Sequence, residues 1–367
     1  MTKGLDFDDV LIIPQFSNVE SRTEPDVSSY IAQDMITQIP IIPANMDCIA
    51  TLSMRDIFIN NGGPFIHHRF VDLEDVKPGE FVTIGMRDCL SSEWKDRVCK
   101  ITNDIGAELC IDIAHAHSKM VLNALKFIRS YNHTGKIIVS NIATGEAARD
   151  FCNEGASALK VGIGPGYSCT TRMVTGCGVP QITAIHWVSK VAKQFKVPVI
   201  ADGGIKTSGD IAKAIAAGAN IVMIGSLLAG TEEAGGRWFT QRVMASELGI
   251  DKVNHMIDIQ KMIDLEESNP TIRPEYKRMF EKRQYPQDLY RQYWGQSSED
   301  FQQEWYGGMK EGIVAEGETK YVPYSGSALD VVKKLLGGLK SSMTYVGAKT
   351  IKEFQKKAEF IEVNRIK

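Results

Sequence analysis

The sequence has few cysteines and no cysteine motif. Seven occur, an odd number, scattered along the chain at positions 48, 89, 99, 110, 152, 169 and 177. None forms a Cys-x-x-Cys pair, so neither a structural zinc site nor a disulfide framework is indicated. A chain of this kind fits a reducing compartment, and we expect a cytoplasmic protein.

Two further features are absent, namely a long apolar run and an excess of positive charge. The N-terminus lacks the apolar core of a signal peptide, and no window approaches the ~18 apolar residues of a membrane span. The formal net charge is −3. Nucleic-acid binding normally requires a concentrated basic face, so we expect neither a nucleic acid nor a membrane as a partner.

What the sequence does contain is an eightfold alternation of apolar runs with helix-period segments. The apolar runs are 39–44, 64–68, 81–86, 108–114, 136–142, 158–164, 197–203 and 220–226. Amphipathic stretches such as 118–131, 181–195 and 208–217 separate them. Nearly continuous apolar strands are typical of a parallel sheet buried on both faces. We predict a (β/α)₈ TIM barrel, and a doubly wound open sheet is the alternative.

The predicted strands end in polar or glycine residues. Examples are Asp112, Asn141, Asp202 and the pair Gly225-Ser226. The carboxyl ends of barrel strands carry the catalytic loops, so this recurrence indicates a functional mouth. Glycines that merely turn the chain would explain one strand end but not this many.

The regular pattern stops after the eighth strand. Residues 237–305 are charged, biased toward helix and contain three of the five tryptophans. We interpret them as an inserted helical arm near the barrel mouth, with 1–236 and 306–367 forming a single catalytic barrel domain. The periodic segment 329–336 is predicted to be the last barrel helix.

A glycine-rich loop that leads to a cysteine is the most informative segment. It reads Gly162-Ile-Gly164-Pro-Gly-Tyr-Ser-Cys169-Thr-Thr171. Its backbone amides can approach an anion closely, and a thiolate beside them is a strong nucleophile. A buried packing cysteine beside a turn is the alternative.

A second constellation follows strands seven and eight, the usual phosphate position in such barrels. Asp202 can accept hydrogen bonds from the two ribose hydroxyls, and the backbone of Gly203, Gly204, Gly225 and Ser226 can donate to phosphate. An aspartate that only caps the next helix is the alternative.

These motifs together resemble the IMP dehydrogenase/GMP reductase family. The resemblance rests on the cysteine loop, on the segments that begin at Ala201 and Met223, and on Leu5–Pro14, Pro43–Asp47 and Leu335–Ala348. It covers about residues 5–236 and 306–365.

The resemblance implies a role for each matching residue. Cys169 resembles the nucleophile that attacks purine C2. The implied substrate contacts are Met46, Tyr167, Ser168, Asp202, Gly203, Gly204, Gly225, Ser226, Gly308 and Met309. Asp112, Asn141, Gly162 and Gly164 fall where the family binds its nicotinamide cofactor. The carbonyls of Gly162, Gly164 and Cys169 are expected to hold a monovalent cation such as K⁺. A homotetramer is also implied.

The choice between the two family reactions depends on residues near the cysteine. A dehydrogenase of this family activates water with an Arg-Tyr pair on a flap, whereas a reductase protonates the leaving amine with a Thr-Glu pair. Thr171 and Glu316 match the reductase pair. Only residues 310–315 separate Met309 from Glu316, and no Arg-Tyr pair lies among them.

We therefore expect an NADPH-dependent GMP reductase that acts on GMP or a close purine nucleotide such as dGMP. IMP dehydrogenase and a catalytically silent nucleotide-binding relative are the alternatives. Tyr167 departs from the family pattern, since a small or basic residue is usual there. This departure leaves the sugar and phosphate preference open.

Overall fold

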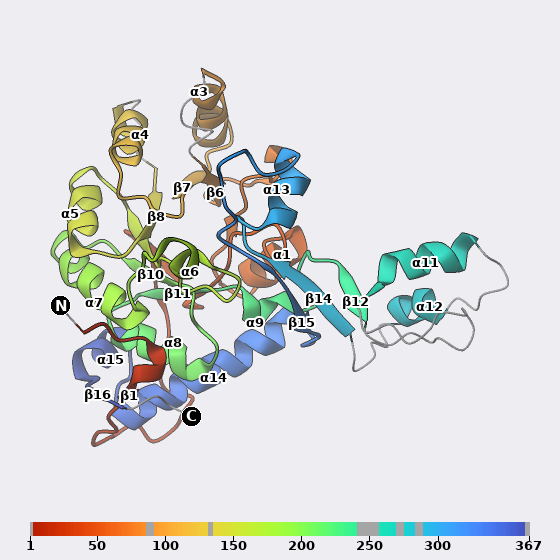
Figure 1. Cartoon of the computed structure of the whole chain (residues 1–367). Coiled ribbons are helices and arrows are strands. Elements are labelled where there is room, and N and C mark those ends of the chain that lie inside the picture. Colours follow the sequence, from red (N-terminus) through yellow and green to blue (C-terminus); the bar gives the residue numbers. More distant parts are fainter. Residues whose placement is uncertain are drawn as a thin grey trace.

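Eight parallel strands form the centre of the molecule (Figure 1). The computed structural model describes residues 3–85, 92–130, 135–240, 257–268, 275–282 and 289–363. The strands are β4 (Ile41–Pro43), β5 (Ile66–His67), β6 (Phe81–Ile84), β7 (Glu108–Asp112), β8 (Ile137–Ile142), β9 (Ala158–Val161), β10 (Val199–Asp202) and β11 (Ile221–Ile224). Each falls within one predicted run, although the end of run 81–86 lies outside the described residues. They are hydrogen-bonded in the order β4-β11-β10-β9-β8-β7-β6-β5. The predicted (β/α)₈ barrel is confirmed.

Helices join most of these strands in the expected alternation. They are α1 (Leu52–Asn60), α3 (Ser92–Cys99), α4 (Lys119–Ser130), α5 (Gly145–Asn153), α7 (Gln181–Ala192), α8 (Ser208–Ala216) and α14 (Ala328–Val346). Between β5 and β6 the described chain forms only the short 3₁₀ turn η2 (Leu73–Asp75). Helix α14 contains the predicted final helix 329–336 and packs on α8.

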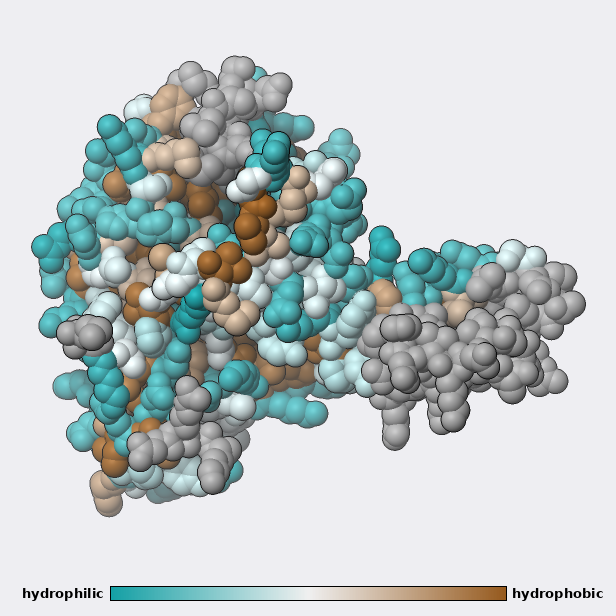
Figure 2. Space-filling view, in the orientation of Figure 1, coloured by the Kyte–Doolittle hydropathy of each residue, from teal (hydrophilic) through white to brown (hydrophobic). Residues whose placement is uncertain are grey.

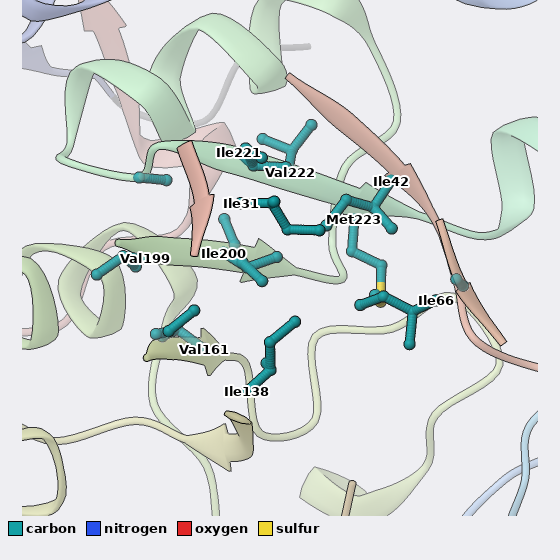
Figure 3. Close-up of a cluster of buried hydrophobic side chains, with 14 of the residues drawn as sticks. Ile31, Ile42, Ile66, Ile138, Val161, Val199, Ile200, Ile221, Val222 and Met223 are labelled. Atoms are coloured by element: carbon teal, nitrogen blue, oxygen red, sulfur yellow. The ribbon is translucent and has the colours of Figure 1, made fainter. Parts of the chain in front are cut away.

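The barrel core is made of aliphatic side chains from the strands. Figure 3 shows Ile42, Ile66, Ile138, Ile200 and Met223, each at most 1% exposed, in one buried cluster. Removing such side chains from water is the main favourable contribution to folding. The apolar strands therefore hold the barrel together and leave their carboxyl ends free for polar groups.

The two ends of the described chain meet on the outside of the barrel. Strand β1 (Val10–Ile12) pairs antiparallel with β16 (Phe360–Glu362). A hairpin of β2 (Ser29–Ala32) and β3 (Met35–Thr37) lies at the opposite end from the strand carboxyl ends, because the Gln33 amide donates to the Ser157 carbonyl just before β9.

The segment after β11 contains strands as well as the expected helices. The helices are α11 (Ile259–Ser268), α12 (Glu275–Glu281) and α13 (Glu299–Tyr306). Strands β12 (Trp238–Thr240), β13 (Ile257–Asp258) and β14 (Leu289–Trp294) join β15 (Thr319–Pro323) in an antiparallel sheet ordered β13-β12-β14-β15. The prediction of a purely helical arm was therefore incomplete.

The physical reason is visible in β14. Its six residues alternate between buried and half-buried before ending in two buried aromatics. This period of two favours a strand, and the charged surroundings obscured it. In Figure 1, α11 and α12 project away from the barrel, whereas α13 lies against it, with Trp305 stacked on Phe70. The domain boundary at 237–305 stays a prediction, and residues 241–256, 269–274 and 283–288 lie outside the described part.

The surface is mostly hydrophilic, with one apolar area on the face seen in Figure 2. Brown atoms gather there where Figure 1 places α6 (Thr171–Thr175) and the loop between α13 and β15. Met173, Ile313 and Val314 in these segments are 78%, 56% and 67% exposed. None of the described helices combines the length and apolar character needed to cross a lipid bilayer.

Candidate active site

A pocket of about 480 Å³ opens at the carboxyl ends of the barrel strands. This is the face on which barrel enzymes place their catalytic loops. Its walls bring together most of the residues predicted from the sequence. These are Met46, Asp112, Asn141, Gly162, Gly164, Tyr167, Ser168, Cys169, Thr171, Asp202, Gly203, Gly204, Gly225, Ser226 and Glu316.

The cysteine loop lies between β9 and α6 and is held by the segment that carries Glu316. The Thr170 amide donates to the Glu316 carbonyl at 2.9 Å, and the Glu318 amide donates to the Ser168 carbonyl at 2.9 Å. At the base of the loop, a Cβ on Gly162 would lie 2.0 Å from the Asp202 carbonyl oxygen, so only glycine fits. The loop is thus fixed on both sides of the thiol.

A hydrogen-bonded chain links the cysteine to a carboxylate. The Cys169 thiol donates to Thr171 Oγ1 at 3.2 Å, and the Thr171 hydroxyl donates to Glu316 Oε2 at 2.8 Å. A hydroxyl has one proton to donate and can accept as well, so Thr171 can relay a proton between the two. The three side chains are half-buried at the pocket wall. The arrangement places a nucleophile and a proton donor within reach of the same bound atom.

A buried lysine lies beneath the pocket. Lys160, on β9, is 2% exposed and contacts Asp112, Asn141 and Asp202. Burial alone would lower the pKa of Lys160, but the charges of Asp112 and Asp202 raise it above its ordinary value. The ammonium therefore stays charged.

Asp112 is held by several protein groups at once. Asn45 donates to its Oδ2 at 2.6 Å, and the Ser140 hydroxyl donates to its Oδ1 at 2.9 Å. Burial opposes ionisation, yet the charges of Lys160 and Arg69 and these hydrogen bonds lower the pKa of Asp112 overall. The carboxylate is thus ionised and fixed in place. Its role toward a cofactor stays a prediction.

The predicted phosphate end is closed by a tyrosine from β14. A Cβ on Gly225 would lie 2.6 Å from the Tyr293 hydroxyl oxygen, so this side chain rests directly on the Gly225 backbone. Tyr167 lies beside it, with ring centroids 6.4 Å apart, and lines the pocket although it is 54% exposed. Tyr167 is therefore not simply a solvent-facing residue.

Gly308 and Met309 do not line the pocket. The segment Gly295-Gln296-Ser297, which directly follows β14, lines it instead. Gln296 Nε2 donates to the Asn45 carbonyl at 3.0 Å, and Arg69 donates to Gln296 Oε1 at 3.2 Å. The geometry does not support the predicted base contact at Gly308 and Met309. Two glycine-containing segments follow one another here, and the sequence does not say which of them packs on the barrel.

This change lengthens the segment between the pocket wall and Glu316. The connection from Gln296 to Glu316 comprises residues 297–315. The short connection that was predicted by counting from Met309 therefore no longer argues against a flap of the dehydrogenase kind. The segment folds into α13, which docks on the barrel. The Trp294 and Trp305 indole N–H groups both donate to Asp47, at 3.1 and 2.7 Å. Burial is the main cause of the raised pKa of Asp47.

The pocket-wall side chains that sequence analysis missed include Arg69, Lys160, Tyr293 and Gln296. Lys160 is a charged residue in the middle of the apolar run 158–164, and that anomaly was the available signal. Arg69 Nε is buried with no hydrogen-bond partner among the described residues, so one of its donors remains available to a ligand. No sequence pattern indicated Tyr293 or Gln296, because their positions in the pocket depend on how β14 packs.

Side-chain contacts do not test the predicted cation site, because backbone carbonyls would form it. The Gly162 carbonyl accepts a hydrogen bond from Asn141 Nδ2 at 2.5 Å. Within the described ranges no three His, Cys, Asp or Glu side chains lie close enough together to hold a metal ion. The K⁺ site stays a prediction.

Comparison with known proteins places these features in one family. The model of the IMP dehydrogenase / GMP reductase domain matches residues 4–78, 83–262 and 281–366. The chain is 32% identical to GMP reductase 2 of Bos taurus over 98% of this chain and 94% of that protein. It is 37% identical to inosine-5′-monophosphate dehydrogenase of Methanocaldococcus jannaschii over 93% of this chain and 61% of that protein.

A third relative is more similar over a shorter stretch. Inosine-5′-monophosphate dehydrogenase of Aquifex aeolicus is 39% identical over 76% of this chain, which spans about half of that protein (49%). The family model, the barrel and the position of the cysteine loop agree with one another. The chain belongs to the IMP dehydrogenase / GMP reductase family.

Proposed function

We propose that the protein is a GMP reductase, which converts GMP to IMP and ammonia at the expense of NADPH. The observation that carries the proposal is the hydrogen-bonded chain from Cys169 through Thr171 to Glu316. It provides a nucleophile and a proton donor for an amine leaving group at the same place.

The first step forms a bond between Cys169 Sγ and purine C2. Thiolates are strong nucleophiles. As the S–C2 bond forms, the bond from C2 to the exocyclic nitrogen breaks. The thiol proton of Cys169 passes through the Thr171 hydroxyl to the Glu316 carboxylate, which returns it to the exocyclic nitrogen, and the nitrogen departs as ammonia. This is general acid catalysis, which contributes about 10²–10⁴-fold in rate.

The second step returns the thiol. A nicotinamide cofactor held in the pocket would supply the hydride that C2 gains. The S–C2 bond breaks with its electrons returning to Cys169 Sγ, which takes up a proton. The overall balance is GMP, NADPH and two protons giving IMP, ammonium and NADP⁺. Asp112, Asn141 and the available Arg69 Nε–H line the side of the pocket that fits the cofactor.

The nucleotide is held at the other side of the pocket. Asp202 accepts from the ribose, and the ends of β10 and β11 carry Gly203, Gly204, Gly225 and Ser226 toward the phosphate. Gly295 and Gln296, which replace Gly308 and Met309 at the wall, face the base together with Met46.

One observation favours the reductase over the dehydrogenase. No arginine occurs in residues 297–315, so the chain lacks the Arg-Tyr pair there. IMP dehydrogenase remains the second candidate, because the dehydrogenases of A. aeolicus and M. jannaschii are more identical to this chain than the bovine reductase is. That reaction would need Arg69 and Tyr306, which line the pocket from different elements, to activate water.

The test is a pair of assays on the purified protein. With GMP and NADPH we expect loss of the reduced-cofactor absorbance together with one ammonia and one IMP per cofactor. Formation of NADH from IMP and NAD⁺, without turnover of GMP, would establish the dehydrogenase instead. Failure of both assays with tight nucleotide binding would indicate a silent relative. A homotetramer and a cytoplasmic location stay predictions.

A further inference from the structure

We propose that Lys160 is a positioning residue that holds Asp202 for the ribose 2′-hydroxyl, so that the pocket selects ribonucleotides over 2′-deoxyribonucleotides. This inference rests on the proposed function, because it assumes that a purine nucleotide occupies the pocket. It answers the question that the sequence left open, namely whether GMP or dGMP is the substrate.

The ammonium of Lys160 is fully used inside the protein. It contacts Asn141 Oδ1 at 2.9 Å, Asp112 Oδ1 at 3.4 Å and Asp202 Oδ2. An ammonium has three protons, and here three oxygens surround it. With its side chain 3% exposed, Lys160 has little access to solvent or ligand. Its function must therefore pass through the groups that it holds.

Asp202 is anchored through only one of its two oxygens. Lys160 and Asn141 Nδ2 both donate to Oδ2, the latter at 3.0 Å. Oδ1 has no hydrogen-bond partner among the described residues, and Asp202 lines the pocket with its side chain 20% exposed. A carboxylate held in this way presents one fixed acceptor, which suits the hydroxyls of a ribose.

The backbone of Asp202 is fixed independently of Lys160. Gln181 Nε2 donates to the Asp202 carbonyl at 3.0 Å and to the Val161 carbonyl at 2.8 Å. Loss of Lys160 would therefore release the Asp202 side chain while the strand end stays in place. The ion pair thus controls the direction of the carboxylate more than the position of the strand.

The expected selectivity follows from the chemistry of the acceptor. A hydrogen bond to an ionised group is stronger than a neutral one, and a fixed acceptor left without its partner is penalised. We expect the unaltered protein to bind GMP about 10-fold or more tightly than dGMP. If the Asp202 side chain were mobile, its carboxylate would hydrogen-bond to water instead. The pocket would then lose most of its preference for GMP over dGMP.

The test is calorimetric binding of GMP and dGMP to the full chain and to Lys160→Met. We expect the dGMP-to-GMP ratio of Kd to fall from about 10 to below about 3 in the variant. Lys213→Met is the matched control, because Lys213 is also a buried lysine, 7% exposed, and its Nζ donates to the Phe7 carbonyl at 2.9 Å away from the pocket. The Lys213→Met variant should be less stable than the unaltered protein and keep its dGMP-to-GMP ratio of Kd.

A second variant covers the case in which Lys160→Met does not fold. Lys160→Arg keeps the charge and should retain a ribose preference of several-fold. A folded Lys160→Met with an unchanged ratio, or a folded Lys160→Arg with no preference, would overturn the inference. If the unaltered protein binds neither nucleotide, the proposed function fails first and takes this inference with it.

Discussion

Phe70 stacks on Trp305, with ring centroids 4.0 Å apart and an angle of 10° between the ring planes. This contact joins the loop after β5 to α13, and Asp47 adds a hydrogen bond to the Trp305 indole. The helix that precedes Glu316 is therefore docked on the barrel through Phe301, Trp305 and Tyr306, which all contact Phe70. Phe301 is buried in the core, whereas Trp305 is 38% exposed and can be replaced without opening the core.

Replacing Trp305 with alanine should loosen α13. The stack and the hydrogen bond to a carboxylate together contribute about 2–4 kcal/mol to docking. We expect kcat/KM to fall about 10-fold or more, with faster proteolytic cleavage within 297–315. Trp187→Ala is the control, since both tryptophans are 38% exposed and Trp187 lies on α7. Equal effects of the two substitutions would argue against a docking role.

Replacing Cys169 with alanine should abolish turnover and leave nucleotide binding largely intact. The reason is that Sγ forms the covalent bond, whereas the walls of the pocket hold the nucleotide. Steady-state assays and calorimetry separate the two effects. Cys177→Ala, at the exposed cysteine of the same loop region, should keep full activity. Turnover by the Cys169 variant would reject the covalent mechanism.

Replacing Glu316 with glutamine should slow ammonia release. An amide cannot deliver the proton, so kcat should fall about 100-fold or more while the Kd of GMP changes little. Thr171→Val breaks the relay and should act in the same direction, whereas Thr171→Ser keeps the hydroxyl. Glu318→Gln is the nearby control, because Glu318 pairs with Lys320. The proton-donor role fails if Glu316→Gln keeps its rate.

Acid should weaken the fold through Glu80. Burial alone would raise the pKa of Glu80, but hydrogen bonds with His67 and the Lys77 amide lower it overall. A lowered folded-state pKa means that the stabilisation is complete above the ordinary value of about 4.3 and is lost as the pH falls below it.

Glu80→Gln should therefore reduce the free energy of unfolding by about 1–3 kcal/mol near neutral pH. The difference from the unaltered protein should close as the pH falls below about 4.3. Denaturant unfolding across this range measures it, with the exposed Glu359→Gln as control. A gap that does not depend on pH would show that the Glu80 charge is not the cause.

The barrel was predictable because its strands are buried on both faces. Runs such as 136–142 and 197–203 are largely apolar, and the polar residues near their carboxyl ends, Asn141 and Asp202, meet at one edge as parallel strands require. Cys169, Thr171 and Glu316 were found through their motifs, and the structure joins them by hydrogen bonds. Local pattern and family resemblance sufficed for these residues.

The predictions that failed concern residues whose positions depend on contacts between distant segments. Gly308-Met309 and Gly295-Gln296 both offer a glycine before a longer side chain, and only the pairing of β14 with β12 and β15 brings the second to the pocket. Sequence analysis did not single out Lys160, because a predicted strand is identified by its apolar residues and not by a charged residue among them. Its partners, Asp112 and Asp202, lie 48 residues before and 42 residues after it in the chain.

The β12–β14 pairing has one more consequence. Thr240 and Leu289 are opposite one another in the register, so the ends of β12 and β14 that flank residues 241–288 lie side by side. A hairpin turn of about two residues can bridge such a pair. The part of the chain between these two residues, which carries α11, α12 and the edge strand β13, is therefore a removable extension: its length can change greatly while Tyr293, Gly295 and Glu316 keep their places, because the pairings of β14 with β12 and β15 do not involve it.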